Sequence, residues 1–157
     1  MDLYQRALAH VKGGRFDQAL SELNEAIENC PQSSPNRALL YFNRGFVYHE
    51  KGNLDQEMAD YETAIKIKPR YADPYYNRAH IYHERGEFDR AIADYDKVIE
   101  INPADAVAYN DRAVMHFFNK AYEKSWGDVR RAEELGYQVN PSFLQELKTA
   151  SPSQDNR

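Results

Sequence analysis

One stretch of this chain is written twice. The residues YFNRGFVYHEKG at 41–52 return as YYNRAHIYHERG at 75–86. Gly52 and Gly86 end these two stretches and are 34 residues apart. Lys120 follows Gly86 by another 34 residues and begins a segment similar to those that follow the two glycines. A fixed period of about 34 residues is typical of proteins built from stacked structural repeats, in which each copy is one small unit that packs on its neighbours.

Four copies of the repeat cover most of the chain, approximately at residues 1–33, 38–71, 72–105 and 106–139. Four extra residues fall between the first two copies, near CPQSSPNR, a composition typical of a loop. PSFLQELKTA at 141–150 predicts a helix that caps the last copy, as terminal units of repeat arrays require. We therefore expect a single domain over 1–150, followed by a disordered tail at 151–157.

Each copy is predicted to be a helical hairpin. Apolar and small residues recur at helical spacing, and a glycine separates two such runs in the first three copies. The first helices are expected at 2–12, 38–50, 72–84 and 106–118. Proline lacks the amide that a helix needs and therefore ends the second helices, at Pro31, Pro69 and Pro103. In the last copy Tyr137 holds that place, and the helix is expected to end at Gly136.

The period and its signature residues resemble the tetratricopeptide repeat (TPR) family. The second copy carries the pattern at Tyr41, Gly45, Tyr48, Leu54, Tyr61, Ala64 and Pro69. The third carries it at Tyr75, Ala79, Tyr82, Phe88, Ala91, Tyr95 and Pro103. This resemblance implies an all-α, right-handed superhelical α-solenoid of four hairpins, whose first helices line a concave groove. The chain departs from the pattern at Glu57, where a small residue is usual, and at His10 and His116, where an aromatic residue is usual.

Each copy has an arginine in its first helix and a carboxylate in its second helix, always 16 residues apart. The pairs are Arg6 with Glu22, Arg44 with Asp60, Arg78 with Asp94, and Arg112 with Asp128. We predict one ion pair within each hairpin, bidentate because arginine presents a planar fork. A structural role is favoured over anion binding, because each arginine already has a carboxylate placed for it.

Composition excludes several classes of partner. The net charge of −5 and the isoelectric point of about 5.5 disfavour nucleic acids and anionic membranes. The single cysteine, Cys30, allows neither an internal disulfide nor a cysteine-rich zinc site. The first residues, MDLYQRALAHVKGG, are amphipathic rather than apolar, so no signal peptide or membrane span is expected and the cytoplasm is the favoured location. A chain trimmed of a leader would look the same.

Nothing in the sequence predicts catalysis or a cofactor. The glycines separate helices rather than form a phosphate-binding loop, and Cys30 has no fixed histidine partner. A metal site at His49, His80 and His83 is geometrically conceivable, but no H-E-x-x-H motif is present. We favour polar groove residues as the interpretation of these histidines and expect no metal.

First-helix positions that the core does not use are expected to face the groove. They are Phe42, Asn43, Phe46, His49 and Glu50 in the second copy, and Asp73, Tyr76, Asn77, His80, His83 and Glu84 in the third. The fourth copy supplies Asn110, Asp111, Val114, Phe117 and Phe118. Asn43 and Asn77 are equivalent, and each amide offers a donor and an acceptor to an extended peptide.

Members of the family that grip an acidic C-terminal carboxylate use lysine and arginine, and that match fails here. Asp73 and Asn77 stand where the cations are wanted, although Asn43 matches. The acidic groove residues favour an apolar or mildly basic segment instead. The leading hypothesis is therefore a non-enzymatic interaction module that binds a partner peptide or helix. The alternatives are a self-associating scaffold, homo-oligomeric through its ends or groove, and an RNA-reading repeat, which the acidic residues disfavour.

Overall fold

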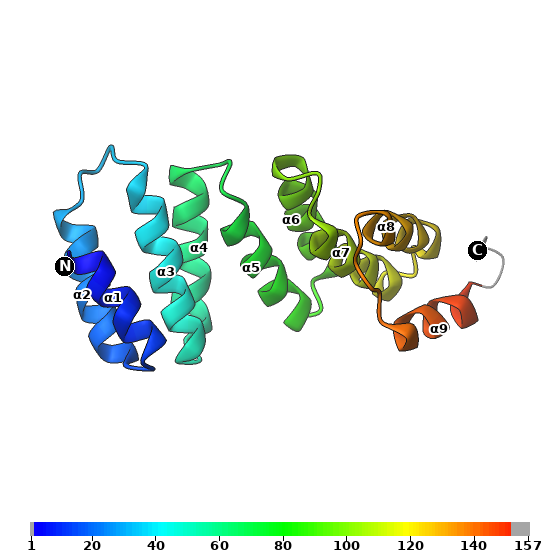
Figure 1. The fold of residues 1–157 in the computed structure, drawn as a ribbon, viewed down its shortest axis with the longest axis horizontal. Coiled ribbons are helices and arrows are strands. Elements are labelled where there is room, and N and C mark those ends of the chain that lie inside the picture. Colours follow the sequence, from blue (N-terminus) through cyan, green and yellow to red (C-terminus); the bar gives the residue numbers. More distant parts are fainter. Residues whose placement is uncertain (1, 152–157) are drawn as a thin grey trace. The chain divides into compact units, whose positions relative to one another are not determined.

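The structure is a computed structural model that describes residues 2–151, and within that range its regular secondary structure is entirely α-helical. The helices are α1 Leu3–Lys12, α2 Phe16–Asn29, α3 Asn36–Glu50, α4 Leu54–Ile67, α5 Ala72–Glu84, α6 Phe88–Ile101, α7 Ala106–Phe118, α8 Tyr122–Glu134 and α9 Pro141–Ala150 (Figure 1). Residue contacts define two compact units, 1–74 and 75–157, whose boundary falls within α5.

The all-α prediction is confirmed. α5, α7 and the capping helix α9 have the expected bounds, while α3 begins at Asn36, two residues before its expected start. The predicted tail lies outside the described residues apart from Ser151. That residues 1–150 fold as one domain stays a prediction. No helix within residues 2–151 is long and apolar enough to cross a membrane.

Small residues set the spacing of the hairpins in the first unit. Its core includes Ala7, Ala19 and Leu23, each fully buried. The second hairpin uses Gly45 where the first uses Ala7, because a Cβ at this position would lie only 2.7 Å from the ring of Tyr61. A glycine here therefore lets α3 approach the aromatic face of α4.

A buried arginine joins the first two hairpins. Arg37 donates to the carbonyl oxygens of Ile27 at 2.7 Å and Cys30 at 2.8 Å, and to the Tyr41 hydroxyl at 3.1 Å. The last carbonyls of a helix have no partner within that helix, so the guanidinium satisfies two acceptors at the C-terminal end of α2. The first turn of α3 is thereby held against α2, within the stretch that sequence analysis assigned to a loop.

The second unit is closed by α9, as predicted. Leu147 of α9 is fully buried in a cluster with Trp126 and Val129 of α8, and Phe143 and Leu144 pack against this cluster. The apolar side of the last hairpin is therefore covered within the chain itself.

The turns between hairpin helices need a left-handed residue. Gly86 has a φ of 71°, and Lys120, its equivalent in the last copy, has a φ of 58°. A residue with a Cβ pays about 1–2 kcal/mol for this conformation. α8 ends at Glu134, two residues before the expected Gly136, whose φ of 87° gives the left-handed turn predicted there.

Candidate functional site

The arginine–carboxylate pairs form in every hairpin, and three of them are bidentate. Arg44 donates to both carboxylate oxygens of Asp60 at 2.8 and 2.7 Å. Arg78 holds Asp94 at the same distances. Arg112 holds Asp128 at 2.9 and 2.6 Å, and also contacts Asp96 at 2.5 Å. The charges of these arginines are therefore occupied within the hairpins.

The first hairpin differs from the prediction of a bidentate pair. Arg6 makes a single contact to Glu22, with its Nε 3.2 Å from Oε1, and its side chain is 48% exposed. The His10 Nε2 lies 3.7 Å from the same oxygen. A long side chain that is this exposed is not fixed in a two-point geometry.

His116 is buried beside one of the ion pairs. Its Nε2 lies 3.7 Å from an oxygen of Asp128. Burial lowers the pKa of His116, and Arg112 and Lys124 lower it further, whereas Asp128 and Asp96 oppose that change. Burial has the largest effect on this pKa, and it acts by disfavouring the charged imidazolium.

We expect this histidine to make stability fall with acidity. Below the ordinary histidine pKa of about 6.5, the unfolded chain takes up a proton that folded His116 resists, so the free energy of unfolding decreases as pH falls toward the lowered pKa. His116→Phe, which restores the usual aromatic residue, should flatten the decline between pH 7 and pH 5.5 in urea titrations. Leu54→Ser, which changes an exposed side chain without a titratable group, is the control and should keep the wild-type slope. An unchanged slope in His116→Phe would contradict the assignment.

One side of α3 carries an exposed apolar stripe in the first unit. We name Leu39, Asn43 and Phe46 the α3 stripe, because their spacing places them on one side of the helix. Leu39 and Phe46 are both among the exposed large apolar side chains. Phe42 lies beside the stripe, with its ring centroid 5.3 Å from that of Tyr71 and partly covered. The stripe thus offers apolar area around one amide.

Asn43 is less available to a peptide than predicted. Its Nδ2 donates to the backbone oxygen of Leu39 at 2.7 Å and lies 3.4 Å from the Tyr4 hydroxyl. The side-chain amide therefore already donates a hydrogen bond within α3, as short polar side chains in helices often do. Its oxygen remains the atom suited to meeting a ligand, as a hydrogen-bond acceptor.

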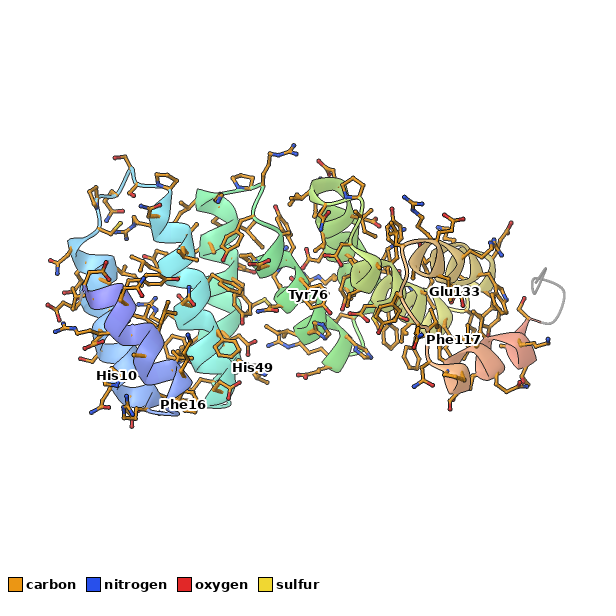
Figure 2. All side chains as sticks on the ribbon, in the orientation of Figure 1. His10, Phe16, His49, Tyr76, Phe117 and Glu133 are labelled. Carbon is orange, nitrogen blue, oxygen red and sulfur yellow. The ribbon has the colours of Figure 1, made fainter. Side chains whose placement is uncertain are left out.

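His49 lies near the end of α3 and contacts α4 (Figure 2). Its Nδ1 is 3.1 Å from Oε1 of Glu57, the buried carboxylate at the position where the repeat pattern usually has a small residue. The half-exposed imidazole thus covers a buried acid. His49 was predicted to face the groove, and its contact with Glu57 was not predicted.

A polar cluster joins α5 and α7 in the second unit. The Tyr76 hydroxyl donates to Oδ2 of Asp111 at 2.6 Å, and Asn110 donates to Oδ1 at 3.0 Å. His80 approaches the same carboxylate, with its Nε2 3.8 Å away. Burial raises the pKa of Tyr76 above its ordinary range, and the bond to Asp111 raises it further, so the hydroxyl stays a donor. Four predicted groove residues are therefore brought together.

An aromatic group continues this surface toward the hairpin turns. Phe118 is 48% exposed and stacks on Phe88 with ring centroids 5.0 Å apart. His83 lies 5.9 Å from Phe118 and 6.2 Å from Phe88. Val114 is partly exposed, one helical turn before Phe118. We name Tyr76, His80, Val107, Asp111, Val114 and Phe118 the α5–α7 face.

Phe117 was predicted to face the groove, and the structure places it elsewhere. Its ring packs edge-on against Phe143 of α9, with centroids 5.6 Å apart, and belongs to the rim of the buried cluster. The capping helix supplies an apolar partner at this end of the chain, so the side chain is partly buried there.

Two other predicted groove residues lie on α5. Asp73 is exposed at the start of α5, and Asn77 is partly buried on α5.

Leu39 and Val107 were not among the predicted groove positions. Both are exposed apolar residues, and they occupy equivalent positions two repeats apart, one helical turn before Asn43 and Asp111 respectively. The same helical spacing that identified the other groove positions could have found them.

Within residues 2–151, no group of three histidine, cysteine or acidic side chains is placed to hold a metal.

Comparisons with known proteins agree on the repeat. Models described as tetratricopeptide repeat match residues 3–33 and 72–105, and a TPR repeat model matches residues 47–86. Together these ranges take up more than half of the chain. A search of curated proteins finds no significant match.

Solved structures share the fold at low identity. A tetratricopeptide repeat protein from Parabacteroides merdae superposes with a TM-score of 0.84 at 23% identity over 94% of this chain, which spans only 58% of that protein. MamA from Desulfovibrio magneticus RS-1 gives 0.79 at 17% identity, covering 98% and 84% of the two chains.

A third structure holds a ligand. The first TPR of Spaghetti (RPAP3) bound to the HSP90 peptide SRMEEVD gives a TM-score of 0.66 at 24% identity, covering 76% of this chain and 94% of that one. At these identities the likeness concerns the fold alone, and proteins of this fold are generally non-enzymatic interaction modules. The matched repeats and the helical hairpins establish that this chain belongs to the tetratricopeptide repeat family.

Proposed function

We propose that this protein is a non-enzymatic interaction module that binds partner peptides or helices on its first-helix faces. One observation carries the proposal. Of the five exposed large apolar side chains among the described residues, four lie along one side of a first helix, which are Leu39 and Phe46 on α3 and Val107 and Phe118 on α7. The fifth, Leu54, begins a second helix.

This placement has an energetic meaning. Exposed apolar side chains are common singly on protein surfaces, but their alignment along one side of a helix gives a strip that a ligand can bury. On the α3 stripe the strip surrounds Asn43, and on the α5–α7 face it surrounds Asp111. Apolar side chains of this kind supply area that a ligand can bury, and a polar group placed among them supplies orientation and specificity.

The charge of these faces argues against an acidic ligand. The peptide held by the RPAP3 domain carries two glutamates and an aspartate in its sequence SRMEEVD. The α5–α7 face presents Asp111, and the nearby arginines Arg78 and Arg112 are bound to carboxylates of their own hairpins. Like charges would repel an acidic terminus, so we infer an apolar or mildly basic segment. A cytoplasmic location stays a prediction of the sequence.

Peptides selected from a random phage-displayed library test the proposal. We expect Phe46→Ser or Val114→Ser to weaken the affinity of selected peptides by on the order of tenfold or more, since each removes apolar area from a strip. Leu54→Ser is the matched control, because Leu54 is 41% exposed but lies off both faces. Isothermal titration calorimetry measures the affinities.

Two results would contradict it. Selected peptides that bind all three variants equally would place the site elsewhere on the protein. Light scattering that shows a dimer dissociated by Phe46→Ser would make a second copy of this chain the occupant of the α3 stripe, which is the scaffold hypothesis.

A further inference from the structure

Asp111 is the carboxylate at the centre of the α5–α7 face. Its side chain is 21% exposed, so it is partly withdrawn from water yet reachable. The groups that donate hydrogen bonds to it are the Tyr76 hydroxyl at 2.6 Å and the Asn110 amide at 3.0 Å. Both donors are neutral, and they fix the orientation of the carboxylate without cancelling its charge.

No lysine or arginine within the described part of the chain reaches Asp111. The basic group nearest to it is His80, with Nε2 at 3.8 Å. In the same unit, Asp94 and Asp128 each hold a bidentate arginine. Asp111 is thus a half-buried carboxylate that lacks the cation its counterparts in the ion pairs have, and partly desolvated charges are stabilised by such a partner.

The surroundings of Asp111 suit a long basic side chain. Val107 and Val114 lie four residues before and three residues after it, on the same side of α7. The rings of Tyr76 and His80 meet edge to face, with centroids 4.8 Å apart, on the neighbouring helix. Lysine and arginine have an apolar stem and a charged head, so the stem can cover a valine while the head reaches the carboxylate.

Asp111 distinguishes the fourth repeat from the two before it. The period places Asn43 and Asn77 at the equivalent position, where the side chain has the same shape without the charge. Asp111→Asn therefore gives the fourth repeat the residue that the chain itself uses twice, and an asparagine oxygen can still accept the hydrogen bond from Tyr76.

We propose that Asp111 is the recognition point for a lysine or arginine side chain of the peptide bound on the α5–α7 face. This assignment rests on the proposed function and makes it more specific. The partner is then a segment with one basic residue between apolar residues. The apolar strip supplies much of the binding, and Asp111 supplies the preference for the basic residue.

The test uses acetylated, amidated peptides of leucine and alanine whose central residue is lysine, arginine, norleucine or glutamate. With the full chain, lysine and arginine peptides should bind about tenfold more tightly than the norleucine peptide. Asp111→Asn should remove this preference, so that the lysine, arginine and norleucine peptides bind the variant with similar affinity. Glu146→Gln, which makes the same change of net charge on α9, should keep the preference.

A second measurement needs no variant. The preference of the wild-type protein for lysine should shrink as sodium chloride is raised, because salt screens a charge pair that stays in contact with solvent. A preference that survives in Asp111→Asn, or that is absent in the wild type, overturns the role of Asp111 and leaves the proposed function standing. Failure of every peptide to bind the wild type overturns the proposed function and this assignment with it.

Discussion

Trp126→Ala is expected to lower the free energy of unfolding by about 3–5 kcal/mol. Trp126 is 2% exposed and packs in the cluster that includes Val129, Val139 and Leu147. Truncation removes the largest buried side chain of the chain and leaves a cavity between α8 and α9. Because a protein of this size is stabilised by only about 5–15 kcal/mol, the loss should be visible as a large shift in urea denaturation followed by circular dichroism.

Two variants make the result interpretable. Trp126→Phe keeps most of the buried area and should lose much less stability than the alanine variant. Leu54→Ala truncates a side chain that is 41% exposed, and its effect should stay within about 0.5 kcal/mol. If Trp126→Ala cost no more than Leu54→Ala, α9 would not close the last hairpin in solution.

Arg78→Ala is expected to cost about 3 kcal/mol, the second largest effect. The Arg78 and Asp94 side chains are 18% and 6% exposed and are joined by two hydrogen bonds. Removing the guanidinium leaves the carboxylate of Asp94 buried without its bidentate partner, which is the costly outcome for a buried pair. The measurement is again urea denaturation, at pH 7.

The first repeat supplies the matched control. Arg6 holds the equivalent position but is 48% exposed and makes a single contact, so Arg6→Ala should cost about 1 kcal/mol or less. The double variant Arg78→Ala with Asp94→Ala should cost less than the sum of the single variants, because the unpaired charge is gone. Equal costs for Arg6→Ala and Arg78→Ala would show that burial does not strengthen the pair.

The fold was largely predictable because the repeat fixes it locally. The bounds of α5 and α7 follow from helical spacing, a glycine turn on one side and a proline on the other, all of which lie in one short segment. The start of α3 was missed because Arg37 stabilises it through carbonyls of Ile27 and Cys30, in another hairpin. A contact of that kind leaves no periodic signal in the sequence.

The candidate site was predictable only as a set of positions. Helical spacing identifies which first-helix residues share a side, but it does not say which hydrogen bonds they already make. Asn43 donates to the backbone oxygen of Leu39, and the Tyr76 hydroxyl donates to the carboxylate of Asp111, because these acceptors lie close by within the chain. Such competition depends on distances of a few tenths of an ångström, which a pattern does not specify.

The repeat, the helical hairpins and the partner of each paired arginine were predictable without coordinates, since all three depend on regular spacing along the chain. The tertiary structure alone decided that Phe117 packs against α9, that Trp126 is enclosed, and that Asp111 is held by neutral donors. Burial and charge compensation depend on which side chains are in contact in the folded protein. Those contacts join segments that are far apart in the sequence, and the repeat pattern does not specify them.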